Sequence, residues 1–339
     1  MSPSGLATPA SDKAIEKDTL KRIQASVRDD LANVSTEISA AIVHEAPLVA
    51  EIGHHLMAMR GKMFRPTLVL LCSATENRPE PQRVTLAAAV ELIHLATLVH
   101  DDAVDHSVLR RGMPTLNTLF THQISVIMGD FLYSVALSRL VGLGDIAALR
   151  ALTRASTEMT VGEMRQLAVN DSLSFTEDDY YALIKSKTAS LMSAACEVGS
   201  IAGASKHREA LIRYGEALGM AFQIADDLID YTEEQETTGK PTGLDLKEHK
   251  VTLPLIAALR VMTPAERGKV NTLFANADPS DRDVSEVIRI VTMNGGLEYA
   301  REKGAGFASE ARDALKSLPD TVARQALLES ISYVMERHA

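Results

Sequence analysis

Residues 91–105 read ELIHLATLVHDDAVD, and residues 219–230 read GMAFQIADDLID. In both stretches an apolar segment ends in the motif Asp-Asp-x-x-Asp. Around the first motif, the apolar residues of 85–104 recur at steps of three and four, which is the spacing of a helix buried along one face. The two stretches therefore predict two amphipathic helices, each of which carries three aspartates near its carboxyl end.

The rest of the chain also favours helices. No proline lies between Pro114 and Pro241, and the other prolines fall where a helix would start or stop. No alternating run bounded by a tight-turn dipeptide indicates a strand. Thr176-Glu-Asp-Asp and Thr263-Pro-Ala-Glu are typical helix starts, since a capping Thr precedes an acid by three residues. We expect an all-α protein of about a dozen helices, with loops at 60–66, 77–81, 107–114, 143–145, 171–176, 233–250, 277–281 and 318–320.

Length and composition limit the function classes. The chain has 339 residues, which suffices for a flexible tail over 1–13 and one large helical domain over 14–339. It has 35 Lys and Arg against 45 Asp and Glu, a net charge of −10, which argues against a nucleic-acid partner. Only two cysteines occur, so a disulfide framework is excluded and a cytoplasmic location fits. We expect neither a secretory signal nor an integral membrane segment, because charges interrupt the long apolar stretches.

The two acidic motifs indicate a divalent cation. Residues four apart share a helix face, so Asp101 lies with Asp105, and Asp226 with Asp230. Like charges on one face, near a helix carboxyl end, are doubly unfavourable unless a cation binds there. A single motif is more often a solvated acidic helix end, but two copies that both follow apolar runs favour a site. Hard carboxylate oxygens without Cys or His beside them suit Mg²⁺.

Basic residues occur in four clusters, in predicted loops or at helix ends. They lie at 60–66, 110–112, 185–188 and 238–250. Each cluster alone is more often ordinary surface charge than a ligand site. Together with two acidic motifs they describe a site for two polyanionic groups, one bound through metal and one directly on Lys and Arg.

These blocks, in this order, resemble the trans-isoprenyl diphosphate synthase (polyprenyl synthetase) family over roughly residues 20–338. The resemblance is carried by Gly61-Lys62-x-x-Arg65-Pro66, by 91–105 with Arg110-Arg111-Gly112, by Lys187-Thr188, by 222–231, and by 239–254. It is closest to the long-chain, octaprenyl-type synthases that make quinone side chains and are homodimers. Three residues depart from the family pattern: Arg60 and Met63, where Gly and Arg are frequent, and His249, where Gly is usual.

The resemblance implies a bundle of the isoprenoid synthase type, with a central cavity lined by the two Asp-rich helices. It implies three Mg²⁺ ions per active site, with Mn²⁺ as an alternative, held by Asp101, Asp105 and Asp226 and supported by Asp102, Asp227 and Asp230. Isopentenyl diphosphate would bind to Lys62, Arg65, His94 and Arg111. The allylic diphosphate, farnesyl or geranylgeranyl, would bind to Arg110, Lys187, Thr188, Gln223, Lys240 and Lys250. For His94, the alternative is a buried histidine bonded to a neighbour.

The implied reaction is head-to-tail condensation of an allylic diphosphate with isopentenyl diphosphate. The six aspartates, Lys187 and Lys240 would stabilise the departing diphosphate. The alternatives are a farnesyl or geranylgeranyl diphosphate synthase, a non-catalytic subunit of a heteromeric synthase, a terpene cyclase and a helical metal-binding scaffold. A second Asp-Asp-x-x-Asp and the Lys62/Arg65 block argue against a cyclase.

Product length should depend on the helix wall upstream of Asp101. Ala96 and Thr97 lie one turn, about 5.4 Å, below the metal motif, where family members that stop at short chains have an aromatic residue. Ile93 follows one turn further, and Met128 is expected on a facing helix. Small side chains at 96 and 97 leave the wall open, which predicts products longer than C20, in the range C30 to C45.

Overall fold

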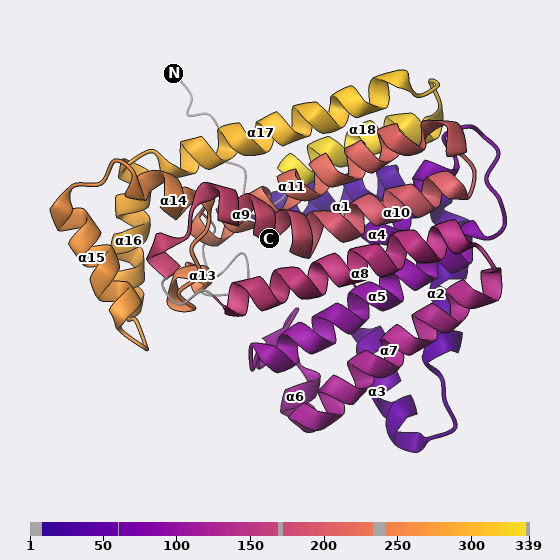
Figure 1. The fold of residues 1–339 in the computed structure, drawn as a ribbon, viewed down its shortest axis with the longest axis horizontal. Helices are drawn as coiled ribbons and strands as arrows, with labels where there is room; N and C mark the ends of the chain where they lie inside the picture. The colour runs from indigo at the N-terminus through magenta and orange to yellow at the C-terminus, as the bar shows by residue number, and fades with distance from the viewer. Residues whose placement is uncertain (1–8, 60, 169–171, 233–241, 337–339) are drawn as a thin grey trace.

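The computed structural model describes residues 9–59, 61–168, 172–232 and 242–336, and the predicted all-α class is confirmed (Figure 1). Its α-helices are α1 (Pro9–Gln24), α2 (Arg28–Ile42), α3 (Pro47–Ala58), α4 (Phe64–Ser73), α5 (Arg83–Val104), α6 (Leu116–Leu119), α7 (His122–Leu143), α8 (Ile146–Leu167), α9 (Glu177–Ile184), α10 (Ser190–Ile201), α11 (Arg208–Thr232), α13 (Leu244–Lys247), α14 (Leu253–Leu259), α15 (Pro264–Ala275), α16 (Asp281–Met293), α17 (Gly296–Ala314) and α18 (Val322–Met335). A π-helical turn, Lys185–Ala189, joins α9 to α10.

Several predicted boundaries differ from the structure. Within the segment expected to be a tail, α1 already begins at Pro9. Helix α4 begins at Phe64, so the basic block at 60–66 is only partly a loop. The segment 107–114 contains two short antiparallel strands, β1 (Leu109–Arg110) and β2 (Met113–Pro114). Each strand has only two residues, which is too short to show a periodic pattern in the sequence. The predicted loop 233–250 contains α13, although 233–241 lie outside the described residues.

Both predicted helix starts are confirmed. Thr176 accepts a hydrogen bond from the Asp179 N–H, and the Asp179 carboxylate accepts one from the Thr176 N–H. Thr263 and Glu266 form the same reciprocal pair at the start of α15. Each pair satisfies two backbone donors that a helix start would otherwise leave unbonded. The first pair fixes where α9 begins, which matters for the site described below.

The core consists of two clusters of buried apolar side chains. The larger one brings α4, α5, α7, α8 and α10 together with the amino-terminal part of α11. The smaller one lies under α14, α16 and the first half of α17. Helix α5 packs against α7, and α11 packs against α10 and α17. The two Asp-rich helices thus belong to the centre of the bundle, with their acidic ends toward the end of the molecule that α13, α15 and α16 occupy (Figure 1).

Helices α5 and α7 are long and apolar enough, by length and composition, to cross a membrane. Charges do interrupt both apolar stretches, Glu91 in α5 and Asp130 and Arg139 in α7, as predicted. The apolar window of α5 is 61% buried inside the bundle, whereas that of α7 is only 33% buried. Since a core helix passes the same test, the finding for α5 needs no membrane.

Candidate active site

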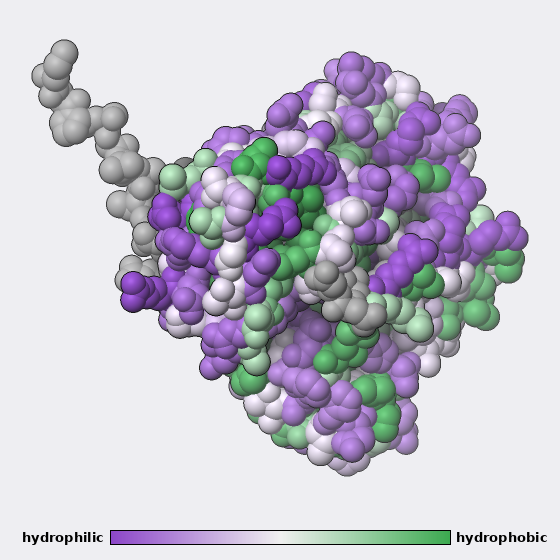
Figure 2. Space-filling model, turned by 60° about the vertical axis from the view of Figure 1, so that its left-hand side comes forward, coloured by the Kyte–Doolittle hydropathy of each residue, from purple (hydrophilic) through white to green (hydrophobic). Residues whose placement is uncertain are grey.

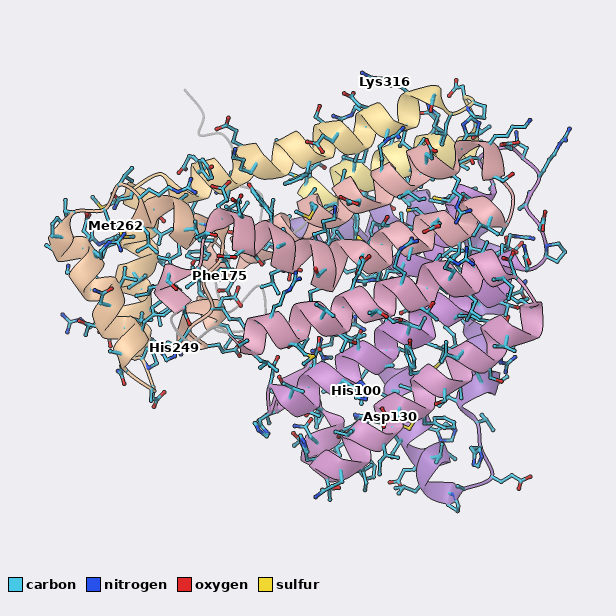
Figure 3. All side chains as sticks on the ribbon, in the orientation of Figure 1. His100, Asp130, Phe175, His249, Met262 and Lys316 are labelled. Atoms are coloured by element: carbon cyan, nitrogen blue, oxygen red, sulfur yellow. The ribbon has the colours of Figure 1, made fainter. Side chains whose placement is uncertain are left out.

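A cavity of about 850 Å³ lies between the acidic ends of α5 and α11, with α8, α9 and the segment after α13 around it. Figure 2 shows a hollow in this end of the molecule, where apolar side chains lie among hydrophilic ones. Phe175, which precedes α9, and His249, which follows α13, both line the cavity and are labelled in Figure 3. The predicted site residues that line it are Arg65, His94, Thr97, Asp101, Asp105, Arg110, Lys187, Thr188, Gln223, Asp226, Asp227 and Lys250.

The three aspartates that are expected to hold metal, Asp101, Asp105 and Asp226, all line this cavity. Asp101 lies in the last turn of α5, and Asp105 follows its end, with its N–H bonded to the Asp101 carbonyl at 2.8 Å. Asp226 lies near the end of α11. Helices α5 and α11 thus present carboxylates to a shared space although the two motifs are far apart in the chain.

The surroundings of Asp101 favour the binding of a positive charge. Its pKa is raised to about 6, first because burial removes water and also because Glu163 and Asp105 lie nearby, while Lys187 opposes the rise. A divalent cation would replace the lost water and offset the repulsion between the carboxylates. The donor set of hard carboxylate oxygens fits Mg²⁺. Within the part of the chain that the structure describes, no three such side chains are yet close enough to hold an ion together.

Asp102 has a different position from its neighbours. It is buried and does not line the cavity. Arg110 donates from Nε to both of its carboxylate oxygens, at 2.9 and 2.8 Å. This charged pair ties the loop after α5 back onto the helix, and the two terminal nitrogens of Arg110 still carry donors for a ligand in the cavity. Asp102 therefore orients Arg110.

The last two aspartates of the second motif also contact protein. Asp227 accepts hydrogen bonds from the Tyr180 hydroxyl at 2.5 Å and from Gln223 Nε2 at 2.8 Å. Burial raises its pKa well above the ordinary value, and Asp245 adds to the rise. Asp230 accepts from the backbone N–H groups of Leu244 and Asp245, at 3.0 and 3.1 Å, and so holds the start of α13.

Arg65 and His94 form the basic wall on the α4 side of the cavity. The Arg65 guanidinium donates to His94 Nε2 at 3.1 Å. The pKa of His94 is well below the ordinary value, because the ring has lost water and because Arg65, Arg111 and Arg110 surround it. His94 is therefore neutral, with its proton on Nδ1. His94 is thus bonded to a neighbour and also lines the cavity, and its contact with isopentenyl diphosphate stays a prediction.

Lys62 and Arg111 do not line the cavity. Lys62 forms an ion pair with Glu16 of α1 and lies 5.8 Å from the centre of the Tyr333 ring. Arg111 donates to the Met59 carbonyl at 2.8 Å, and burial lowers its pKa. Their predicted contact with isopentenyl diphosphate would require both side chains to exchange these partners.

The π-helical turn places Lys187 and Thr188 in the cavity. A Cβ added to Gly219 of α11 would lie 2.5 Å from the Ala189 Cα, so α11 approaches this turn more closely than a side chain would allow. Lys187 pairs with Glu163 at 2.5 Å and donates to Gln166 at 3.2 Å. Sequence reasoning missed both partners, which lie on α8 outside any recognisable motif.

The remaining predicted residues lie around α13. Lys250 lines the cavity and pairs with Glu248 at 2.6 Å. Lys240 and Arg60 lie outside the described residues. His249 and Met63, two of the departures from the family pattern, have φ values of 56° and 54°. This left-handed conformation favours glycine, which explains physically why glycine is usual at position 249.

The predicted chain-length wall falls on two faces of α5. Thr97 lines the cavity and donates to the His94 carbonyl at 2.8 Å. Ala96, Ile93 and, on α7, Met128 are buried and do not line it. Residues 93 and 96 share the face of His100, which lies beside Asp130 of α7 at 3.4 Å (Figure 3). Two of the three α5 positions are thus turned toward α7.

Comparison with known proteins identifies similar proteins over most of the chain. The family model described as polyprenyl synthetase matches residues 46–291. The chain is 37% identical to the all-trans-nonaprenyl-diphosphate synthase (geranyl-diphosphate specific) of Rhodobacter capsulatus, over 94% of this chain and 98% of that protein. It is 35% identical to the octaprenyl diphosphate synthase of Escherichia coli K12, over 94% and 99%. A polyprenyl synthase structure from Caulobacter crescentus CB15, complexed with calcium and isoprenyl diphosphate, superposes with a TM-score of 0.90 at 34% identity, over 94% of this chain and 98% of that chain.

Proposed function

The chain belongs to the polyprenyl synthetase family, and from that premise we propose that it elongates an allylic diphosphate with isopentenyl diphosphate units to a long-chain, all-trans polyprenyl diphosphate. The observation that carries the proposal is the single cavity in which Asp101, Asp105 and Asp226 face Lys187 and Lys250. Carboxylates and lysines around one space suit a diphosphate bound between metal and lysine.

Mg²⁺ would be held by Asp101, Asp105 and Asp226, and when bound it supplies positive charge against the departing diphosphate. Lys187 and Lys250 would donate to the same diphosphate once they exchange Glu163 and Glu248 for it. The terminal nitrogens of Arg110 would add donors from the end of α5. Lys240, which lies outside the described residues, keeps its predicted place among them. Each contact is strongest where negative charge develops on the leaving group.

The second substrate would bind on the opposite wall. Arg65 would donate to the diphosphate of isopentenyl diphosphate, and neutral His94 would donate through Nδ1. The apolar side chains of Leu98, Met159 and Leu191 line the cavity between the two walls. They would exclude water from the allylic carbocation until the double bond attacks it, after which the released diphosphate takes up the proton.

Long-chain products are supported by the relatives, two of which are named for nonaprenyl and octaprenyl products. A role in making quinone side chains and a cytoplasmic location are parts of the same proposal. A geranylgeranyl-type synthase is the second candidate, because such a structure, from Pyrococcus horikoshii, superposes with a TM-score of 0.84. A non-catalytic subunit is disfavoured because none of the principal aspartates is missing.

The reaction itself is tested by incubating the purified protein with Mg²⁺, farnesyl diphosphate and labelled isopentenyl diphosphate. We expect label to enter a hydrophobic product, and we expect EDTA to abolish this, since the carboxylates then have no cation to present. If isopentenyl diphosphate is not consumed while the folded protein still binds Mg²⁺ and diphosphate, the protein is a non-catalytic subunit and the proposed activity is wrong.

We further propose that the protein is a homodimer, joined through α7 and α8. Ile127 and Val141 of α7 are each 65% exposed and lie about four turns apart on one side. Val161 and Met164 add further exposed apolar area on α8. A second copy of the chain would cover this surface with the same surface of its own, as two-fold dimers do.

Sedimentation of the purified protein is expected to give twice the chain mass of 36.7 kDa. Ile127→Lys should shift the mass toward one chain, because a charge would be buried at the centre of the interface. Lys316→Gln, on an exposed face of the carboxyl-terminal region, serves as the control (Figure 3). A single-chain mass for the unmodified protein would contradict the proposal.

A further inference from the structure

Tyr180 contacts the second acidic motif although it belongs to none of the recognised sequence blocks. It lies in α9, is 2% exposed, and its hydroxyl donates to Asp227 Oδ2 at 2.5 Å. The other oxygen of the same carboxylate accepts from Gln223 Nε2 at 2.8 Å. Both oxygens of Asp227 are thus held by neutral donors, directly beside the proposed metal ligand Asp226.

The contact continues through Gln223 to Thr188 of the π-helical turn. Thr188 donates to Gln223 Oε1 at 2.7 Å. The Gln223 amide therefore has its oxygen toward Thr188 and its nitrogen toward Asp227, and each end has a partner. One Nε2 hydrogen is committed to Asp227, and the second remains for an oxygen of a bound diphosphate. Four side chains from α9, α11 and the π-helical turn therefore form one connected chain, with Tyr180 at its end.

Helix α9 is held firmly enough for Tyr180 to act in this way. Its first turn is fixed by the Thr176 cap. Glu177 accepts from the Tyr299 hydroxyl at 2.9 Å and from Arg260 at 2.6 Å, which ties α9 to α17 and to the end of α14. The position of the Tyr180 hydroxyl is thus set by contacts outside the cavity, so a ligand in the cavity does not have to supply it.

We propose that Tyr180 is a positioning residue for the metal-diphosphate site: its hydroxyl holds the Asp227 carboxylate, and through it the Gln223 amide, in the orientation that receives the allylic diphosphate with its Mg²⁺. The inference rests on the proposed function and adds to it a residue that the motifs do not contain. Groups that orient a metal site from behind typically change metal affinity or activity by 10- to 100-fold when removed.

Tyr180→Phe tests this, since it removes the hydroxyl and keeps the ring that packs against Tyr181, at 5.7 Å between ring centres. Tyr214→Phe is the matched control. Tyr214 is buried on α11, the helix of Asp227, and its hydroxyl donates to the Leu327 carbonyl at 3.0 Å, away from the cavity. Both variants lose one hydroxyl and one buried hydrogen bond, so their melting temperatures should fall by similar amounts.

The measurement is Mn²⁺ binding in the presence of inorganic diphosphate, followed by electron paramagnetic resonance. We expect Tyr180→Phe to weaken Mn²⁺ binding about tenfold or more, and Tyr214→Phe to leave it within about twofold. Asp227→Ala should weaken it as well, and adding Tyr180→Phe to Asp227→Ala should cost nothing further, because the hydroxyl then has no carboxylate to hold. Asp227→Asn changes the acceptor of the Tyr180 hydrogen bond and should also weaken Mn²⁺ binding.

Three results would overturn the proposal. They are Mn²⁺ binding by Tyr180→Phe within twofold of the unmodified protein, an equal loss in Tyr214→Phe, and a further loss when Tyr180→Phe is added to Asp227→Ala. Because the readout is ion binding, it does not depend on prenyl transfer. An unmodified protein that binds Mn²⁺ with diphosphate but consumes no isopentenyl diphosphate would refute the proposed function and leave this inference standing.

Discussion

Replacing Asp101 or Asp226 with asparagine is expected to lower the rate of isopentenyl diphosphate incorporation by about a thousandfold, the upper range for loss of one preorganised electrostatic group. Asparagine keeps the size of the side chain and removes the charge that a cation needs. Because Asp101 lies on α5 and Asp226 on α11, equal losses at both would show that the two helices serve one site. Initial rates at saturating Mg²⁺ measure the effect.

Asp130→Asn is the control for this substitution. Asp130 is an exposed aspartate on α7 that pairs with His100 and does not line the cavity. Its loss removes an exposed contact with His100, which is worth little, so the rate should stay within about twofold. If either Asp101→Asn or Asp226→Asn kept more than about a tenth of the activity, the paired-carboxylate site would be wrong.

Placing a phenylalanine on α5 below the metal motif is expected to shorten the product to C15 or C20. Thr97→Phe should act directly, because Thr97 lines the cavity one turn below Asp101. Ala96→Phe, the change that the sequence suggests, should act similarly, because a chain longer than C20 must leave the cavity and extend beyond this turn. Chromatography of the dephosphorylated products measures their length.

Thr97→Val separates blockage from loss of polarity. It keeps the size of the side chain and removes only the hydrogen bond to the His94 carbonyl, so long products should persist. Unchanged long products from both Thr97→Phe and Ala96→Phe would show that the growing chain does not pass α5. Shortening by Thr97→Phe alone would place its path on the cavity face and away from α7.

The residues that sequence reasoning located are those whose spacing itself has a physical meaning. Asp101 and Asp105 are spaced by one helical turn and follow an apolar run, and the aspartates of the second motif are arranged in the same way. This spacing is sufficient to predict two acidic helix ends. The basic clusters could be predicted as a set, because a site for diphosphates needs them. Their individual partners depend on packing, so the pairing of Lys62 with Glu16 and of Arg110 with Asp102 could not be predicted.

Tyr180 and Glu163 carry no comparable signal. Tyr180 follows the Thr176 cap in a short helix, where a tyrosine is an ordinary core residue, and its contact with Asp227 spans 47 residues of sequence. The one available hint is that α9 leads directly into the Lys187-Thr188 block, so its buried face had to lie near the cavity. The different orientations of Ala96 and Thr97 could not be predicted either, because adjacent helix residues differ by about 100° and only packing shows which one meets the cavity.

The product length made by the unmodified protein tests the central claim most directly. Purified protein would be supplied with Mg²⁺, farnesyl diphosphate and an excess of isopentenyl diphosphate, and the products sized after dephosphorylation. An all-trans polyprenyl product between C30 and C45 is the result that we predict. Products that end at C20 or shorter under excess isopentenyl diphosphate would contradict it and leave a geranylgeranyl-type synthase in its place.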